Sequence, residues 1–554
     1  MVPRLISNGF LRMGILLSIL IGQKVVTEQK DFVCLSERQE PMGQSWEKHT
    51  RFKIRTQHAP PRRPKPFPFY PKVGKVGLFK TLVKETLSYN FKLLKREYRS
   101  ALLSRPCIYG VFSGPVGGFA PRRELCTGCL RCVQEFPEFC TVEKNPEFNK
   151  FADSYWQAKD LTKESTSPYL LVINEAENGK IPVKGMGYKG SFADEGWDTI
   201  WTDMSEIVRP TRDGIYGREY ISTETMIGAR SIVPDFGALI HQPVAPHLKL
   251  TLPIVFDHLP SQISSKLVTE SIAKASSDVG TCFIASNAQV KHLKEEFKSR
   301  QIIHAEKFAD LENIDADAIE VDLGSFLSLN PFEDEIASIY SGEYWKDAME
   351  IVAKVRSLTQ GKVLIVKLPL TETSGMRISE LLQQVEIEGV HLYADYHGRT
   401  FAQQFEFPEF IKDSLRRVHE TLIKDGIRDR ITIIASGGII LAEHVPKAMI
   451  CGADVVAINT TVLVALQMKF KGECRTPDSA IHIDGFNTQW GRQRLVNLLA
   501  AWHYQLLEVL SAMGMRDVRR LRGDVGRAIF KEEIEKEAFG EIRGFAENGG
   551  GVSY

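Results

Sequence analysis

The sequence predicts an α/β protein: a (β/α)8 barrel with a cysteine-rich, iron–sulfur type segment ahead of it and a helical extension after it. Two observations carry this prediction. From residue 250 onward, eight short apolar runs alternate with helical stretches, which is the pattern of a closed parallel barrel. Upstream, four cysteines fall within fifteen residues. We therefore expect an N-terminal arm (1–74), a cysteine-rich and lead-in region (75–235), the barrel (236–470) and the extension (471–554).

Length and composition set the class of protein. A chain of 554 residues is too long for one ordinary domain but long enough for a barrel with appended pieces. The net charge of +1, with 25% charged residues, gives no sign of a nucleic-acid partner. The nine cysteines suit a metal site in a reducing compartment better than a disulfide framework, so we expect a cytoplasmic protein.

The first hundred residues read as an arm followed by a helix. An apolar run at Met13–Ile21 is too short to span a bilayer, and we interpret it as part of an overextended start, with a signal segment as the alternative. Residues 51–72 are basic and proline-rich, which predicts an extended arm without a core. Residues 75–104 are basic and amphipathic. We expect this helix to pack on its own domain, with peripheral membrane or partner contact as the alternative.

The cysteine cluster has the spacing of an iron–sulfur ligand set. Cys126, Cys129 and Cys132 form a C-x2-C-x2-C triplet, which can wrap one face of a cubane cluster. A ferredoxin-type motif would continue with Cys-Pro after three residues, but the next cysteine here is Cys140. Cys140 is the first choice for the fourth ligand of a [4Fe-4S] cluster and Cys107 the second. A three-iron cluster or a zinc ion is the alternative.

The barrel can be counted strand by strand. Most of the predicted strands are separated by helical stretches, at Ser264–Ser276, Val290–Phe297, Tyr344–Ser357, Arg377–Val385 and Phe410–Lys424. The eight predicted strands are Leu250–Phe256, Gly280–Ala285, Ile302–Glu306, Ala318–Leu323, Val363–Leu368, Val390–Asp395, Ile431–Ala435 and Val455–Ile458. After the barrel, Gln493–Met513 predicts a long amphipathic helix.

Two strand–helix turns near the end of the barrel predict a phosphate site. Ser436-Gly437-Gly438 follows the seventh strand and is expected to open a helix, with glycines that let backbone N–H groups approach a ligand. Asn459-Thr460-Thr461 follows the eighth strand and offers N-cap residues for the next helix. Adjacent turns of this kind hold a phosphate in many (β/α)8 barrels. The alternative is a pair of ordinary turns.

These last two units also carry a family resemblance. The stretch RRVHETLIKDGIRDRITIIASGGI and the following CGADVVAINTTVLVAL resemble the FMN-binding domain of glutamate synthase. The chain is most similar to stand-alone glutamate-synthase-like flavoproteins with an iron–sulfur segment ahead of the barrel. The resemblance runs from about Cys107 to about Phe530 and implies that FMN binds through Ser436, the two glycines and the Asn459–Thr461 turn.

The resemblance also assigns residues at the barrel mouth. Lys367 ends the fifth strand, where the family has a lysine at the N1/O2 edge of the flavin, and a cation there stabilises the reduced flavin. The alternative for Lys367 is a core ion pair with Glu320 or Asp322. After strand six, His397 could supply a proton and Asp395 could orient it. The alternative is that both merely pair with Arg399.

The departures from the family concern the substrate. Glutamate synthases have glycine-rich loops after strands two, four and six, whereas this chain has Ala285-Ser286-Asn287, Gly324–Leu327 and Tyr396–Thr400. We therefore expect the flavin to be kept and the substrate changed. We also expect no second cluster after the barrel, where Cys474 stands alone, and no glutaminase domain in this chain.

The predicted function is an FMN- and iron–sulfur-dependent oxidoreductase. It would take electrons from a donor such as ferredoxin or a reductase subunit and pass them to a small substrate at a C=N, C=C or CH–NH2 bond, in glutamate-type chemistry. The alternative is an electron-transfer subunit of a larger complex that has no substrate site of its own, or a barrel that has lost its flavin. We expect an oligomer.

Overall fold

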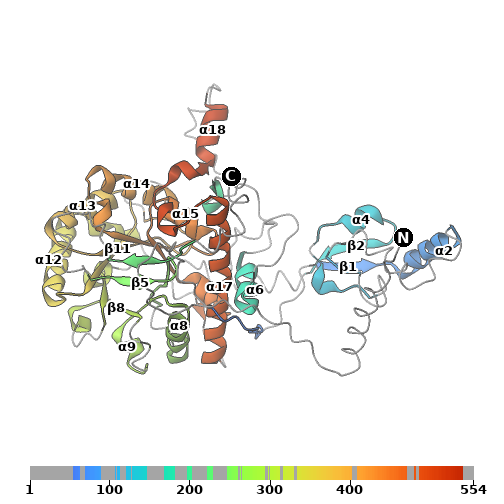
Figure 1. The fold of residues 1–554 in the computed structure, drawn as a ribbon, viewed down its shortest axis with the longest axis horizontal. Coiled ribbons are helices and arrows are strands. Elements are labelled where there is room, and N and C mark those ends of the chain that lie inside the picture. Colours follow the sequence, from blue (N-terminus) through green and yellow to red (C-terminus); the bar gives the residue numbers. More distant parts are fainter. Residues whose placement is uncertain are drawn as a thin grey trace, which may run out of the picture.

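The computed structural model describes thirteen helices and sixteen strands (Figure 1). The residues that it describes are 54–62, 69–88, 107, 109–112, 120–126, 128–145, 168–180, 196–202, 221–228, 246–259, 263, 265–293, 297, 300–311, 316–329, 334–401, 409–470, 480–481 and 486–540. Cys34, Cys474, residues 1–53 and residues 89–106 lie outside them. Within the described residues, no helix is both long and apolar enough to cross a membrane.

The predicted barrel is confirmed. Eight parallel strands close in the order β10-β11-β12-β13-β6-β7-β8-β9. Each strand from β7 to β13 pairs in parallel with the strand before it in the chain, and β6 pairs in parallel with β13 to close the barrel. The strands of the barrel are β6 Ile254–Phe256, β7 Phe283–Ala285, β8 Gln301–Ala305, β9 Ala318–Asp322, β10 Val363–Pro369, β11 Gly389–Tyr393, β12 Thr432–Ser436 and β13 Val455–Ile458.

The first strand begins later than predicted. Leu250 belongs to β5 (Leu248–Leu250), which pairs antiparallel with β4 (Thr225–Ile227) and forms a hairpin. Residues 251–253 bend the chain before β6 begins. Leu248, Leu250 and Ile227 belong to the same buried apolar cluster as the inward side chains of the barrel. The hairpin therefore covers the end of the barrel at which the strands begin.

Helices surround the barrel. α8 and α14 match the predicted bounds to within three residues, but α9 spans only Asn287–Val290, because a Ser286–Gln289 capping box starts it early. The helices are α2 Lys75–Ser88, α4 Arg131–Glu135, α6 Pro168–Asn178, α8 Lys266–Val279, α9 Asn287–Val290, α11 Leu323–Phe326, α12 Gly342–Leu358, α13 Ser374–Gln384, α14 Ile411–Lys424, α15 His444–Ile450, α16 Thr460–Ala465, α17 Thr488–Ala512 and α18 Lys531–Phe539.

The long C-terminal helix α17 packs on the barrel beside α8 and α6, as Figure 1 shows. Its Arg494 is fully buried, and the guanidinium donates to the carbonyls of Ala465, Ala59 and Ile173 at 2.5, 2.9 and 3.1 Å. One side chain thus joins the helix to α16, to the N-terminal segment and to α6. A guanidinium suits this position because its donors are spread in a fixed plane.

Part of the N-terminal arm differs from the prediction. Residues 54–62 are extended, but Ile54 and Ala59 are buried. Asn497 of α17 holds the segment, donating to the Gln57 carbonyl at 2.7 Å and accepting from its N–H at 3.2 Å. Proline-rich composition correctly indicated an extended chain. It could not indicate that this segment lies against a helix more than 430 residues away.

The cysteine-rich region forms a small sheet. β1 (Phe69–Val73) pairs antiparallel with β2 (Cys140–Lys144), so this unit begins before the predicted boundary at residue 74. In α2, Leu78 is buried in the apolar cluster that also holds Phe139, which fits the prediction that this helix packs on its own domain. Three smaller pairings complete the described strands: β3 Ile200–Thr202 with β16 Ala528–Phe530, β14 Lys469–Phe470 with β15 Ala480–Ile481, and β4 with β5.

Candidate functional site

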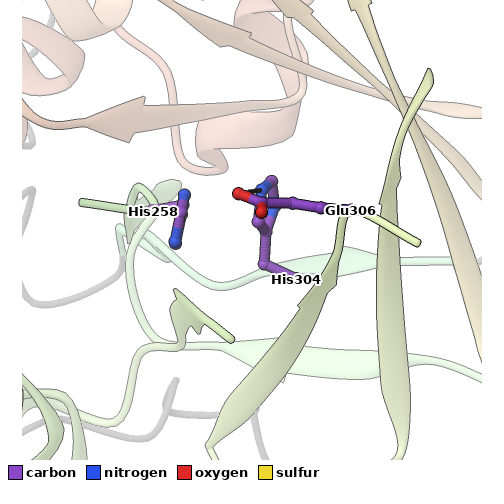
Figure 2. Close-up of side chains that lie close together, drawn as sticks. All are labelled: His258, His304 and Glu306. Carbon is purple, nitrogen blue, oxygen red and sulfur yellow. Dashed lines mark ion pairs between the residues drawn. The ribbon is translucent and has the colours of Figure 1, made fainter. Parts of the chain in front are cut away.

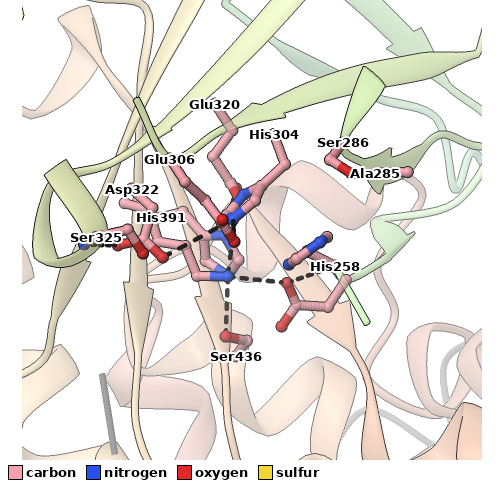
Figure 3. Close-up of polar contacts among 12 residues, drawn as sticks. His258, Ala285, Ser286, His304, Glu306, Glu320, Asp322, Ser325, His391 and Ser436 are labelled. Atoms are coloured by element: carbon pink, nitrogen blue, oxygen red, sulfur yellow. Dashed lines mark hydrogen bonds and ion pairs between the residues drawn. The ribbon is translucent and has the colours of Figure 1, made fainter. Parts of the chain in front are cut away.

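The interior of the barrel changes from apolar to polar toward the ends of the strands. Alternate residues of a strand face the same side. The inward positions near the strand starts, such as Val255, Ile302 and Val363, form one apolar cluster. Continuing each strand by steps of two leads to polar residues: Asp257, His304, Glu320, Asp322, Lys367, His391 and Ser436. These residues gather at the mouth of the barrel, where active sites of this fold lie (Figure 3).

Glu320 is the centre of this polar layer. Its side chain is fully buried, and its two oxygens lie 2.8 Å from His304 Nδ1 and 2.6 Å from His391 Nδ1. Because a carboxylate only accepts, both histidines carry the proton on Nδ1. His391 Nε2 then accepts from the Ser436 hydroxyl at 2.9 Å. A hydrogen-bonded chain thus runs from the turn after β12 to β8.

Lys367 ends this layer at the mouth. Its ammonium lies 3.3 Å from Asp257 and 3.7 Å from Glu320, and its side chain is 11% exposed. The predicted position at the strand end is therefore occupied by a lysine that is ion-paired within the barrel. The nearest partner is Asp257, which directly follows β6. Lys367 also lies 5.6 Å above the Tyr393 ring.

The neighbouring charges in this layer determine the ionisation states of Glu320 and Lys367. Burial alone would raise the pKa of the Glu320 carboxyl, but Lys367 and the two histidines outweigh it and hold that pKa well below its usual range. Burial would likewise lower the pKa of Lys367, but Asp257, Glu320 and Asp322 raise it. Lys367 therefore stays protonated and Glu320 ionised at neutral pH.

The sequence reasoning missed His304, Glu306 and His391. His304 of β8 is stacked on His258, with ring centroids 3.9 Å apart, and its Nε2 lies 3.7 Å from the Glu306 carboxylate (Figure 2). The signal that could have found His304 and His391 is the period of two along β8 and β11. Glu306 continues the same inward series from His304. Those strands were recognised from their apolar residues alone.

The glycine turn after β12 carries two backbone amides for which the described residues provide no acceptor. Gly437 and Gly438 are buried, and neither amide donates a hydrogen bond to a described residue. Both have left-handed backbone angles, with φ of +101° and +66°. They therefore cannot open a helix as predicted, and α15 begins only at His444. Buried N–H groups without an acceptor are rare in folded proteins, so this turn is suited to an anion.

The second predicted turn lies beside the first. Thr461 donates its hydroxyl to the Ile439 carbonyl at 2.8 Å, which joins the two turns. Asn459 caps α16 by accepting from the Thr460 N–H at 2.6 Å, and its amide group donates to Asp257 at 3.1 Å. The side chains of this turn are thus engaged within the protein, which leaves the glycine amides as the available donors.

The loop after β11 uses Asp395 as a backbone cap. Its carboxylate accepts from the N–H groups of His397 at 2.9 Å and Arg399 at 2.7 Å. Gly398 packs against the glycine turn, because a Cβ on Gly438 would lie 2.7 Å from its Cα. Asp395 therefore shapes the loop that carries His397 next to the predicted phosphate turn. A proton-donating role for His397 and Asp395 stays a prediction.

The cysteines line a separate pocket that is partly open to solvent. Its lining includes Cys107, Cys126, Cys129 and Cys132, with Val111 and Phe112 as apolar neighbours. Cys140 is not among the lining residues. Instead, its thiol is hydrogen-bonded to Cys132 and is nearly fully buried.

The thiols of the triplet already accept hydrogen bonds. Cys126 accepts from the Gly128 amide and Cys132 from the Val133 amide. The Cys140 thiol lowers the pKa of Cys132 to about 7, and burial together with the Cys132 bond raises the pKa of Cys140. No three sulfur atoms of the described cysteines lie within 4.8 Å of one another, whereas a tetrahedral zinc ion needs them roughly 3.8 Å apart.

Comparison with known proteins indicates the class of protein to which this chain is similar. Residues 344–516 match a conserved region in glutamate synthase. The chain is 23% identical over 451 residues to an archaeal-type glutamate synthase [NADPH] of Dehalococcoides mccartyi, covering 73% of this chain and 86% of the relative. It is 26% identical over 431 residues to the archaeal glutamate synthase [NADPH] of Methanocaldococcus jannaschii, covering 67% and 82%. Over two thirds of its length or more, the chain is therefore similar to archaeal-type glutamate synthases, which supports a glutamate-synthase-like family for this (β/α)8 barrel.

Solved structures give weaker likeness. A mandelate oxidase mutant with a monooxide FMN adduct is 13% identical, with a TM-score of 0.36, and covers 68% of this chain and 94% of its own. A lactate oxidase of Pediococcus acidilactici is 14% identical, with a TM-score of 0.35, and covers 64% and 92%. At these scores the likeness carries no argument about ligands.

Proposed function

We propose that the protein is an FMN- and iron–sulfur-dependent oxidoreductase of the glutamate-synthase-like family. The observation that carries this proposal is the pair of buried amides at Gly437 and Gly438, which donate to no residue in the part of the chain that the structure describes and so suit the phosphate of FMN. The cofactors, when bound, would let single electrons from a donor be delivered as pairs to a small substrate. The chain's own residues would bind the phosphate of FMN, hold the edge of its flavin ring and shape the mouth of the barrel.

Lys367 would stabilise the flavin ring of FMN. Its ammonium is held at the mouth by Asp257 and Glu320, so it is fixed in position and remains charged. A fixed cation beside the N1/O2 edge would stabilise the reduced, anionic ring. The ion pair in the barrel and the flavin contact are compatible, because an ammonium has three donors. Ser436, through His391 and Glu320, would keep the turn and the lysine in one bonded unit.

The cluster would be held by Cys126, Cys129 and Cys132, and for the fourth ligand the cavity favours Cys107 over Cys140. Cys107 lines the cavity together with the triplet. Cys140 does not line it, and its thiol is hydrogen-bonded to Cys132. The hydrogen bonds that the Cys126 and Cys132 sulfurs accept from backbone N–H groups are of the kind that tune the reduction potential of a cluster.

The names of the relatives indicate a substrate class, and the altered loops of this chain indicate a related substrate within it. The relatives are named glutamate synthases that use NADPH, which supports chemistry at a C=N bond or its CH–NH2 product. The matched conserved region begins in α12, so β6 to β9 and their loops lie outside it. We propose a related imine or C=C substrate, with His397 as proton donor. The second candidate is an electron-transfer subunit, favoured by the altered loops.

A ligand-side titration tests the phosphate site. Gly438→Asp would place a Cβ against Gly398, so loss of flavin in that variant could also mean loss of the fold. Flavin-depleted protein should instead be titrated with FMN and with riboflavin, which lacks the phosphate. Two hydrogen bonds from backbone amides to a charged phosphate contribute about 3 kcal/mol, so FMN should bind ~100-fold more tightly than riboflavin. Equal affinities would rule out the glycine turn as the phosphate site.

A second experiment separates the enzyme from the electron-transfer subunit. Anaerobic protein is reduced through ferredoxin, and imino and enoyl acids are screened for reoxidation of the bound flavin. Turnover with a small acid supports the enzyme. Reoxidation only by a partner protein supports the subunit.

A further inference from the structure

The mouth of the barrel holds a second constellation that neither flavin nor cluster explains. We propose that His258, His304 and Glu306 form a binding site for a divalent transition-metal ion of the zinc class. One nitrogen from each imidazole and one carboxylate oxygen lie within 4.8 Å of one another, and a tetrahedral ion with bonds of roughly 2.1 Å needs them about 3.4 Å apart. His304 Nε2 and the Glu306 carboxylate are already 3.7 Å apart, close to that separation.

Each histidine already has the partner that a metal ligand needs. A ligating imidazole usually donates its other N–H to a carboxylate or amide oxygen, which fixes the tautomer. His304 donates Nδ1–H to Glu320 at 2.8 Å, so Nε2 presents its lone pair toward Glu306. The His258 ring is within hydrogen-bonding reach of the Gln289 side chain, which is itself fixed by Ser286 and Leu259.

The charge balance also favours a cation. Four carboxylates, Asp257, Glu306, Glu320 and Asp322, face the single ammonium of Lys367, a formal sum of −4 + 1 = −3. A divalent ion would reduce this excess to −1. Asp322 stands ready as a further ligand, since its Oδ2 lies 3.8 Å from His304 Nε2 while Oδ1 caps α11.

The site has an entry path and a distinct place in the barrel. The Glu306 side chain is 53% exposed, whereas that of His304 is 1% exposed, so an ion can arrive from the mouth. In the closed order of strands, β8 lies four strands from β12 and so across the barrel from the glycine turn. An ion there would leave the phosphate site untouched and offer an open coordination position to a carboxylate or carbonyl oxygen of a substrate.

Cobalt(II) is the probe, because its visible spectrum distinguishes the ligands. Full-length protein with its cluster loaded anaerobically is treated with a mild chelator and titrated with Co²⁺, with and without FMN. We expect one equivalent to bind with the ligand-field bands of nitrogen and oxygen ligands. Glu306→Gln, at an exposed position, should weaken binding at least tenfold, and His258→Ala should do the same. His292→Ala, at a half-buried histidine outside the group, should bind like the wild type.

Several results would overturn the proposal. They are the absence of a saturable equivalent, unchanged affinity in both Glu306→Gln and His258→Ala, or thiolate-to-cobalt charge-transfer bands that place the ion at the cysteines. Retention of secondary structure by circular dichroism is checked for each variant. Because Co²⁺ is measured on protein with and without FMN, failure of the metal site and failure of the flavin proposal give separate results.

Discussion

Replacing Lys367 by Met should destabilise the barrel strongly. The variant removes the ammonium from between Asp257 and Glu320, whose side chains are only 3% and 0% exposed. Removing one partner of a buried pair costs about 3–5 kcal/mol. The remaining carboxylates keep other donors, since Asp257 accepts from the His258 N–H and Asn459, and Glu320 keeps two histidines. We therefore expect the lower end, about 3 kcal/mol, or ~6–12 °C in melting temperature.

Thermal melts of Lys367→Met and wild type, followed by circular dichroism, measure this cost, with Lys346→Met at an exposed site of α12 as the matched control. Asp257→Asn should reduce the cost of Lys367→Met, because one unpaired charge is then absent. The pH dependence has a fixed sign. Lys367 depresses the pKa of Glu320, so its stabilisation is present at neutral pH and lost as pH falls below the ordinary value of 4.5. A melting shift like that of Lys346→Met, or one that grows on acidification, would refute the reasoning.

Three further predictions concern other parts of the molecule. Cys107→Ser should lower iron content and change the electron paramagnetic resonance of anaerobic protein, whereas Cys140→Ser should keep four irons per chain; the opposite result would restore Cys140 as ligand. Burial and the Arg428 guanidinium lower the pKa of His419 to about 4, so stability should fall by roughly 2 kcal/mol, allowing for solvent screening, as pH drops from 6.5 toward 4. His419→Gln should flatten that slope in urea denaturation; an unchanged slope would exclude His419 as its source. His397→Ala should slow substrate-driven reoxidation of flavin by ~10²–10⁴ and leave reduction through the cluster intact; equal slowing of both steps would make His397 structural.

Much of the barrel could be predicted because its strands are buried on both faces. Such strands appear as continuous apolar runs, and all eight predictions agree with the observed strands to within one residue at one end or at both. The polar layer could not be predicted in the same way. His304, Glu320 and His391 are separated by up to 87 residues and meet only because the barrel closes.

Local chemistry misled at one other point. Ser436-Gly437-Gly438 has the composition of a helix opening, but the left-handed angles of both glycines delay the helix to His444. The choice between Cys140 and Cys107 as the fourth cluster ligand stays a prediction. That Cys107 lines the cavity with the triplet is a tertiary feature that cysteine spacing does not encode.

The buried guanidinium of Arg494 sets an order of assembly. It joins the N-terminal segment at Ala59 to α6 and α16, yet it lies in a helix that begins at Thr488 of a 554-residue chain. Synthesis proceeds from the N-terminus, so residues 54–62 wait for nearly the whole chain to emerge before their partner exists. Until then, the apolar surfaces of α6 and α8 that α17 covers are open to other contacts. A nascent chain stalled before residue 488 should therefore be the most aggregation-prone length, and chaperone capture should peak there.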